Sequence, residues 1–195
     1  VDKQDIDLNL HKDFLYSLSM QCWTNEYAFF VTDDEKKLFE NLKSNIEDII
    51  TSSEDLTDIE PLLSLYACYQ SPVDIEGLIG KTKKLARRGN GNFKNFVQIQ
   101  IDDAIEESKI KKTITQFTPI DDSISKMVQD MYEESPYPRG VEPVIIDKHM
   151  IDETPQNVLF AGCGTGFQIL GFSQQYPNGT FTAVDLSGSS LAYAI

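Results

Sequence analysis

Apolar side chains recur every three to four positions through the first part of the chain, and this spacing predicts amphipathic α-helices. One stripe comprises Phe14, Leu15, Leu18, Cys22, Trp23, Tyr27 and Phe30. A second comprises Leu38, Phe39, Leu42, Ile46 and Ile49. Thr32 followed by Glu35 predicts a capping box at the start of the second helix. We expect both stripes to be core.

Two further helices are expected before the pattern changes. A short apolar helix is predicted over Pro61–Tyr69, and the stretch from Asn92 to Ile114 is favoured as helix although its middle alternates like a strand. An Asp-rich turn then leads into an apolar stripe of Ile124, Met127, Val128 and Met131. Pro136 and Pro138 forbid the continuation of that helix.

From Asn157 onward the chain alternates between strand and helix. "NVLFA" is an apolar run suited to a buried parallel strand, "GCGTG" is a turn and "FQILGFSQQY" a helix. "FTAV" predicts a second strand that ends at Asp185, and Ser187 is the expected N-cap of the next helix.

These patterns predict an α/β protein in three parts. Residues 1–115 form a helical region, residues 116–145 a helix and Pro-rich linker, and residues 146–195 a partial Rossmann-like domain. The chain begins with Val1 and ends inside an apolar run, so we expect it to be a fragment of a longer protein. Two parallel strands do not complete a doubly wound sheet.

The glycine turn and the acid after the second strand form a nucleotide-binding pattern. Glycines admit positive φ angles and let a ligand approach the backbone without a Cβ clash. Asp185 follows Gly164 by roughly twenty residues, the distance at which an acid accepts hydrogen bonds from ribose hydroxyls.

The glycine spacing discriminates between cofactors. Dinucleotide-binding turns have a small residue at the third position of G-x-G-x-x-G/A, where this chain has Phe167. The glycines run instead as G-x-G-x-G, at Gly162, Gly164 and Gly166. This pattern resembles motif I of class I S-adenosylmethionine-dependent methyltransferases, and "TAVDLS" resembles their second motif. We favour a methyltransferase over an NAD-binding oxidoreductase.

The resemblance extends over nearly the whole chain. "QCWTNEYAFFVTDDE", "TPIDDSIS", "MYEESPYPRG", "VLFAGCGTG" and "AVDLSGSSLAYA" look like a bacterial group of these methyltransferases that is often fused to tetratricopeptide repeats. It implies S-adenosyl-L-methionine as cofactor. The turn Gly162, Cys163, Gly164, Thr165 and Gly166 would wrap its methionine portion. Asp185 would bind the ribose and Leu186 the adenine.

The resemblance also implies that Tyr132, Tyr137 and Arg139 lie over the cofactor or the substrate entrance, and the alternative is a structural latch formed by the same segment. Two positions depart from the family. Phe160 stands where many members have an acid, and Gly140 stands where the group has tryptophan after the arginine. We therefore expect fewer polar contacts to the methionine end and the loss of one aromatic wall.

Composition excludes other classes. A net charge of −14 argues against a nucleic-acid partner. Cys22, Cys68 and Cys163 lie far apart in the sequence and include no CxxC pair, so we expect no metal. An odd and sparse set of cysteines fits a reducing compartment, so we expect a cytoplasmic location. No apolar run spans a membrane.

The sequence leaves the catalytic residues, the oligomeric state and the methyl acceptor open, although repeat fusions in relatives favour a protein acceptor by analogy. We expect the parent protein to be a methyltransferase and this chain alone to be inactive. The alternative is a helical interaction or regulatory module with a non-catalytic Rossmann remnant.

Overall fold

The structure is a computed structural model that describes residues 7–52, 56, 59–88, 91–140 and 147–195. It is mostly helical, at 62%, and carries a two-stranded parallel sheet, so the chain is an α/β mixture. Its contacts divide it into two compact units, residues 1–105 and 106–195, which are described separately. No helix among these residues has the length and apolar character needed to cross a membrane.

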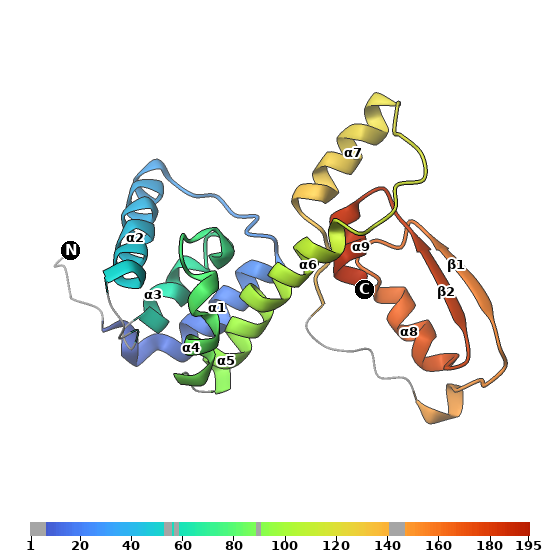
Figure 1. Cartoon of the computed structure of the whole chain (residues 1–195), viewed down its shortest axis with the longest axis horizontal. Helices are drawn as coiled ribbons and strands as arrows, with labels where there is room; N and C mark the ends of the chain where they lie inside the picture. The colour runs from blue at the N-terminus through green and yellow to red at the C-terminus, as the bar shows by residue number, and fades with distance from the viewer. Residues whose placement is uncertain (1–6, 53–55, 57–58, 89–90, 141–146) are drawn as a thin grey trace. The chain divides into compact units, whose positions relative to one another are not determined.

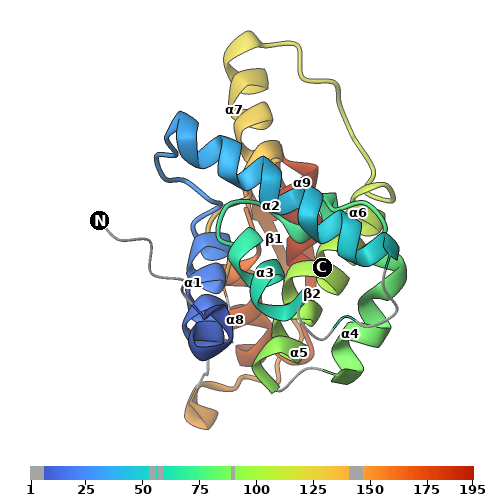
Figure 2. The ribbon, with the colours of Figure 1, turned by 90° about the vertical axis from the view of Figure 1, so that its left-hand side faces the viewer.

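The first unit consists of helices and short helical turns. In chain order they are η1 (Leu8–His11), α1 (Lys12–Thr24), α2 (Asp33–Ser52), α3 (Ile59–Tyr66), η2 (Pro72–Asp74), η3 (Ile79–Lys81), α4 (Thr82–Arg88), α5 (Gly91–Val97) and the π-helical segment η4 (Gln98–Asp103). Helix α3 packs against both α1 and α2 (Figures 1 and 2). The predicted helix from Asn92 is confirmed, with the π-helical segment in its middle.

The core of this unit is aromatic and aliphatic. Tyr66 and Phe93 are completely buried, and the ring of Phe39 stacks on that of Tyr66 at a centroid distance of 4.7 Å. Tyr16 packs against Phe93 and donates a hydrogen bond from its hydroxyl to Glu60. Burying such rings supplies a large share of the hydrophobic free energy of a small unit.

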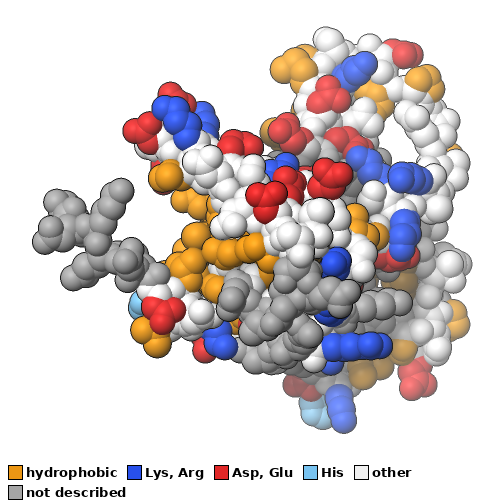
Figure 3. Space-filling model, turned by 60° about the vertical axis from the view of Figure 1, so that its left-hand side comes forward, with side chains coloured by type: hydrophobic (Ala, Val, Ile, Leu, Met, Phe, Trp, Pro, Cys, Tyr) orange, Lys and Arg blue, Asp and Glu red, His pale blue; other side chains and the backbone are white. Residues whose placement is uncertain are grey.

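The apolar stripe predicted for this part of the chain was only partly right, because α1 ends at Thr24 and Tyr27 and Phe30 lie beyond it. Leu15 and Trp23 are buried, but Phe14 is 64% and Phe30 88% exposed. Residues 14 and 23 lie on opposite sides of a helix with 3.6 residues per turn. The buried face is set by Leu15, Tyr16, Ser19 and Trp23, and a polar serine within it was not part of the apolar pattern. Figure 3 shows apolar side chains gathered on the surface of this unit beside charged ones.

Helix α2 begins where its cap predicts. The backbone amide of Thr32 donates to Glu35 Oε2 at 2.8 Å, and the amide of Glu35 donates to Thr32 Oγ1 at 3.2 Å, so the capping box is confirmed. Ile46 is buried as predicted, but Leu38 is 68% exposed. Leu38 lies about 100° around the helix from Phe39, which faces the core.

The second unit holds the remaining elements. In chain order they are most of α6 (Ala104–Lys111), α7 (Ser123–Glu134), η5 (Lys148–Met150), β1 (Asn157–Ala161), α8 (Phe167–Gln175), β2 (Thr180–Val184) and α9 (Gly188–Ala194). Strand β1 pairs with β2 in parallel, with Phe160 opposite Ala183. Helices α8 and α9 lie beside the sheet in Figure 1. The predicted bounds of β1 are confirmed, and β2 ends at Val184 as predicted but begins at Thr180, before the predicted Phe181.

Strand β1 was predicted to be a buried parallel strand, and only one of its faces is buried. Phe160 is 9% exposed and packs edge-on against Phe172 of α8, with ring centroids 5.4 Å apart. Leu159, which points to the opposite face, is 63% exposed. Successive side chains of a strand point to opposite faces, so α8 covers only the face that carries Phe160.

Candidate functional site

The turn between β1 and α8, residues 162–166, requires glycine at its three glycine positions. Gly162, Gly164 and Gly166 have φ angles of +71°, +53° and +80°, a region that L side chains rarely adopt. We call this segment the glycine turn. The G-x-G-x-G spacing therefore has a direct backbone cause, which is a left-handed residue at every second position.

Space around these glycines differs. A Cβ at Gly162 or Gly164 would meet no atom within 4 Å, so the space above both is open. A Cβ at Gly166 would lie 2.7 Å from the Cβ of Ala194 in α9. The third glycine therefore permits helices α8 and α9 to approach closely, whereas the first two leave room for a ligand beside the backbone.

Asp185 is the first residue after β2, and its carboxylate reaches back to the glycine turn. Its Oδ2 accepts a hydrogen bond from the backbone amide of Gly164 at 2.8 Å, and its Oδ1 accepts one from the amide of Ser187 at 2.9 Å. Both oxygens are thus oriented by the backbone. Each keeps a second lone-pair site for a donor from a ligand.

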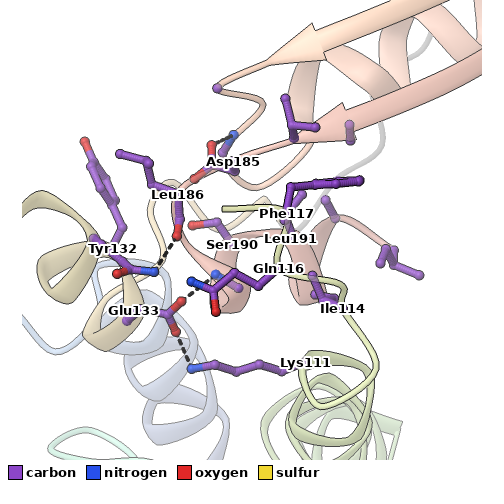
Figure 4. Close-up of a pocket in the computed structure, with 18 of the residues that line it drawn as sticks. Lys111, Ile114, Gln116, Phe117, Tyr132, Glu133, Asp185, Leu186, Ser190 and Leu191 are labelled. Atoms are coloured by element: carbon purple, nitrogen blue, oxygen red, sulfur yellow. Dashed lines mark hydrogen bonds and ion pairs between the residues drawn. The ribbon is translucent and has the colours of Figure 1, made fainter. Parts of the chain in front are cut away.

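A cavity of about 1230 Å³ lies beside this carboxylate, and the residues that line it all belong to the second unit. Figure 4 shows Asp185 and Leu186 following the end of β2, with Tyr132 and Glu133 on α7 and Phe117 on the segment between α6 and α7. Apolar lining comes also from Ile114, Ile120 and Val128. The cavity therefore combines polar groups at the strand end with an apolar wall.

Six of the ten expected site residues line this cavity, and the other four do not. Those that line it are Gly162, Gly164, Asp185, Leu186, Tyr132 and Tyr137. Cys163, Thr165, Gly166 and Arg139 are not among the lining residues. Burial, followed by the nearby Asp185 carboxylate, raises the pKa of the Cys163 thiol.

Arg139 is held away from the cavity by other groups of the second unit. Its guanidinium donates to Glu107 at 3.1 Å and lies over the ring of Tyr193, 5.1 Å from the centroid. Its side chain is 12% exposed. Next to it, Thr165 Oγ1 donates to the carbonyl of Pro138 at 2.5 Å. These contacts hold the Arg139 side chain outside the cavity, whereas Tyr137 lines it.

The two departures from the family pattern have packing explanations. Phe160, at the position of the missing acid, fills the space between β1 and α8. At Gly140, a Cβ would collide with the ring of Phe167. Its carbonyl accepts a hydrogen bond from the hydroxyl of Tyr193 at 2.7 Å. A larger side chain at position 140 would therefore have to displace Phe167.

Sequence reasoning missed three polar residues at this site, which are Glu133, Lys111 and Gln129. Glu133 forms an ion pair with Lys111 and accepts a hydrogen bond from the amide of Gly188 at 2.5 Å. Burial alone would raise the pKa of Glu133, but bonds from Lys111, Gly188 and Ser189 lower it on balance. No local pattern connects residues that are 55 positions apart, so the sequence carried no signal for this contact.

Four of the five backbone amides of the glycine turn have acceptors. The amides of Gly162 and Cys163 donate to the carbonyl of Val184, and that of Gly166 donates to the carbonyl of Cys163. The amide of Gly164 is bound by Asp185. The carboxylate of Asp185 at the amide of Gly164 would repel a phosphate group placed there, so the turn is better matched to a ligand without phosphates.

Comparison with protein-family models, curated proteins and solved structures found no match to this chain. Within the described residues, no group of three or more histidine, cysteine, aspartate or glutamate side chains is arranged to hold a metal ion. The functional interpretation of the site therefore rests on its own geometry and chemistry.

Proposed function

We propose that this chain is the cofactor-binding part of an S-adenosylmethionine-dependent methyltransferase with a Rossmann-like fold. The observation that carries the proposal is the carboxylate of Asp185, which the amides of Gly164 and Ser187 orient at the edge of the cavity. A fixed carboxylate with free lone pairs at the end of the second strand is suited to the two ribose hydroxyls of a nucleoside.

The neighbouring residues fit the rest of such a cofactor. Leu186 is 44% exposed and lines the cavity, where it offers an apolar surface for the adenine ring. The open space above Gly162 and Gly164 accommodates the chain attached to the ribose. When bound, the cofactor would supply an activated methyl group. The residues of this chain would orient it and exclude water, and such positioning is the main requirement of a group transfer without acid–base chemistry.

A dinucleotide is less compatible with the same residues. The amide of Gly164 is occupied by the Asp185 carboxylate, which would repel a pyrophosphate at the turn. Phe167 stands at the third small position of the dinucleotide pattern. The net charge of −14 adds long-range repulsion against a polyanionic ligand.

The methyl acceptor is proposed to be a protein, by the analogy with repeat-fused relatives alone. We assign the reaction to the cytoplasm because the sequence has an odd and sparse set of three cysteines, which is typical of a reducing compartment.

Titration calorimetry of the wild-type chain tests this function. We expect saturable heat with S-adenosylhomocysteine, which is the methyltransferase product and cannot itself react, and no saturable heat with NAD at the same concentration. A preference for NAD would replace the proposal with a dinucleotide-binding function. No binding of S-adenosylhomocysteine would overturn the proposal that this chain holds the cofactor.

A further inference from the structure

Helix α7 holds the loop that carries the proposed cofactor residues. We call residues 185–189, which run from the end of β2 into the first turn of α9, the second-strand loop. Gln129 Nε2 donates to the carbonyl of Leu186 at 2.9 Å, and Ser187 Oγ donates to the carbonyl of Tyr132 at 2.9 Å. Both partners come from α7, which lines the cavity as well. The position of this loop therefore depends on a helix more than fifty residues earlier in the chain.

Glu133 makes several of the contacts between α7 and this loop. Its carboxylate accepts from the amide of Gly188 at 2.5 Å and from Ser189 Oγ at 2.9 Å. It also pairs with Lys111, whose Nζ donates to Ser189 Oγ at 2.8 Å. The Glu133 side chain is 23% exposed. Charge-assisted bonds in a partly buried place are stronger than exposed ion pairs.

These contacts act on Asp185 through one intermediate residue. Ser187 binds Asp185 Oδ1 through its amide, and the same residue lies next to Gly188, which Glu133 holds. If Gly188 is released, the second-strand loop can shift, and the carboxylate of Asp185 loses one of the two amides that orient it. The side chain of Leu186 lies in the same loop.

We propose that Glu133 is a positioning residue, which fixes the second-strand loop so that Asp185 and Leu186 are preorganised for the nucleoside. This role deepens the proposed function and rests on it, because the nucleoside is the ligand for which the loop is held. Preorganisation of a binding loop improves affinity because less ordering is required on binding.

Three variants at position 133 separate this role from a general effect of charge. Glu133→Ala removes every contact. Glu133→Gln keeps a side-chain oxygen at the same distance for the amide of Gly188 but loses the charge. Glu133→Asp keeps the charge but is one methylene too short. Glu134→Ala is the matched control, because Glu134 is an exposed acid on the same helix.

The readout is the affinity for adenosine and for S-adenosylhomocysteine, together with hydrogen exchange of the backbone amides of residues 186–190. We expect Glu133→Ala and Glu133→Asp to bind both ligands at least about tenfold more weakly and to exchange these amides faster, as loss of a charge-assisted bond implies. Glu133→Gln should lose less than Glu133→Asp, and Glu134→Ala should match the wild type.

Two outcomes would overturn the positioning role. One is wild-type affinity and exchange in Glu133→Ala, and the other is a smaller loss in Glu133→Asp than in Glu133→Gln, which would show that charge alone matters. If the wild type binds neither ligand, the proposed function fails, and hydrogen exchange alone decides whether Glu133 holds the loop. If Glu133→Ala does not fold, the relative affinities of Glu133→Asp and Glu133→Gln still decide whether Glu133 positions the loop.

Discussion

Individual residues at the cavity and next to it have roles that their type alone does not reveal. Gly162 and Gly164 border open space, whereas Gly166 borders Ala194. Arg139 was expected at the cofactor and is instead bound to Glu107, while Glu133, which the sequence did not single out, contacts the second-strand loop. Residue type and spacing indicated where a ligand could bind, but long-range partners decide which side chain points to it.

Cys68 permits a test of burial at the residue scale. It is 4% exposed, and burial, with a smaller contribution from Cys22, raises its pKa to about 12 from 9.0. We expect it to resist thiol reagents at pH 8 in the folded protein and to react in urea, because only the thiolate is reactive. Reaction of all three cysteines at equal rates in the folded chain would contradict the buried position.

The same shift makes the first unit sensitive to alkali. A thiol whose pKa is higher in the folded state favours folding below pH 9 and loses this contribution as the pH rises from 9 towards 12. Trp23, the only tryptophan, lies in this unit and reports its unfolding by fluorescence. The urea midpoint should fall less steeply over this pH range in Cys68→Ala than in the wild type. If the urea midpoint falls equally steeply with pH in both proteins, Cys68 is not the cause of the alkali sensitivity.

At the scale of elements, capped helix starts were predictable, but helix C-termini and buried faces were not. Thr32 and Ser187 cap their helices as expected, because a cap is a local contact between residues three positions apart. The buried face of α1 was predicted only in part, since burial is decided by the partners of the helix. Helix α7 shows the same limit, because Met127 in its apolar stripe is 70% exposed.

The packing of α8 against α9 gives a matched pair of glycine variants. Gly166→Ala must place a Cβ at positive φ and against Ala194, so we expect a loss of stability of at least about 1–2 kcal/mol. Gly171→Ala, inside α8 with no atom near its Cβ position, should stabilise by about 1 kcal/mol. Thermal unfolding followed by far-UV circular dichroism measures both. Equal effects of the two changes would contradict the close approach of the helices.

At the scale of the whole molecule, the sequence predicted an α/β chain with a helical first part and a two-stranded parallel sheet, and the structure confirms these features. It also located the glycine turn and Asp185, because both lie within one βαβ unit. The cavity was not predictable, since its wall combines residues 111–137 with residues 162–195. A pattern within one segment cannot indicate contacts between two.

The most direct test of the proposed cofactor site asks whether Asp185 binds a ribose hydroxyl. Adenosine and 3′-deoxyadenosine are titrated into the wild type, into Asp185→Asn and into Asp130→Asn, a control at an acid of α7 whose side chain points to solvent. A hydrogen bond to a charged group contributes about 1.5–3 kcal/mol, so the wild type should prefer adenosine by roughly tenfold or more.

We expect Asp185→Asn to lose most of this preference and Asp130→Asn to keep it. If Asp185→Asn distinguishes the two nucleosides as strongly as the wild type does, the carboxylate does not bind the ribose, and the proposed cofactor site is contradicted.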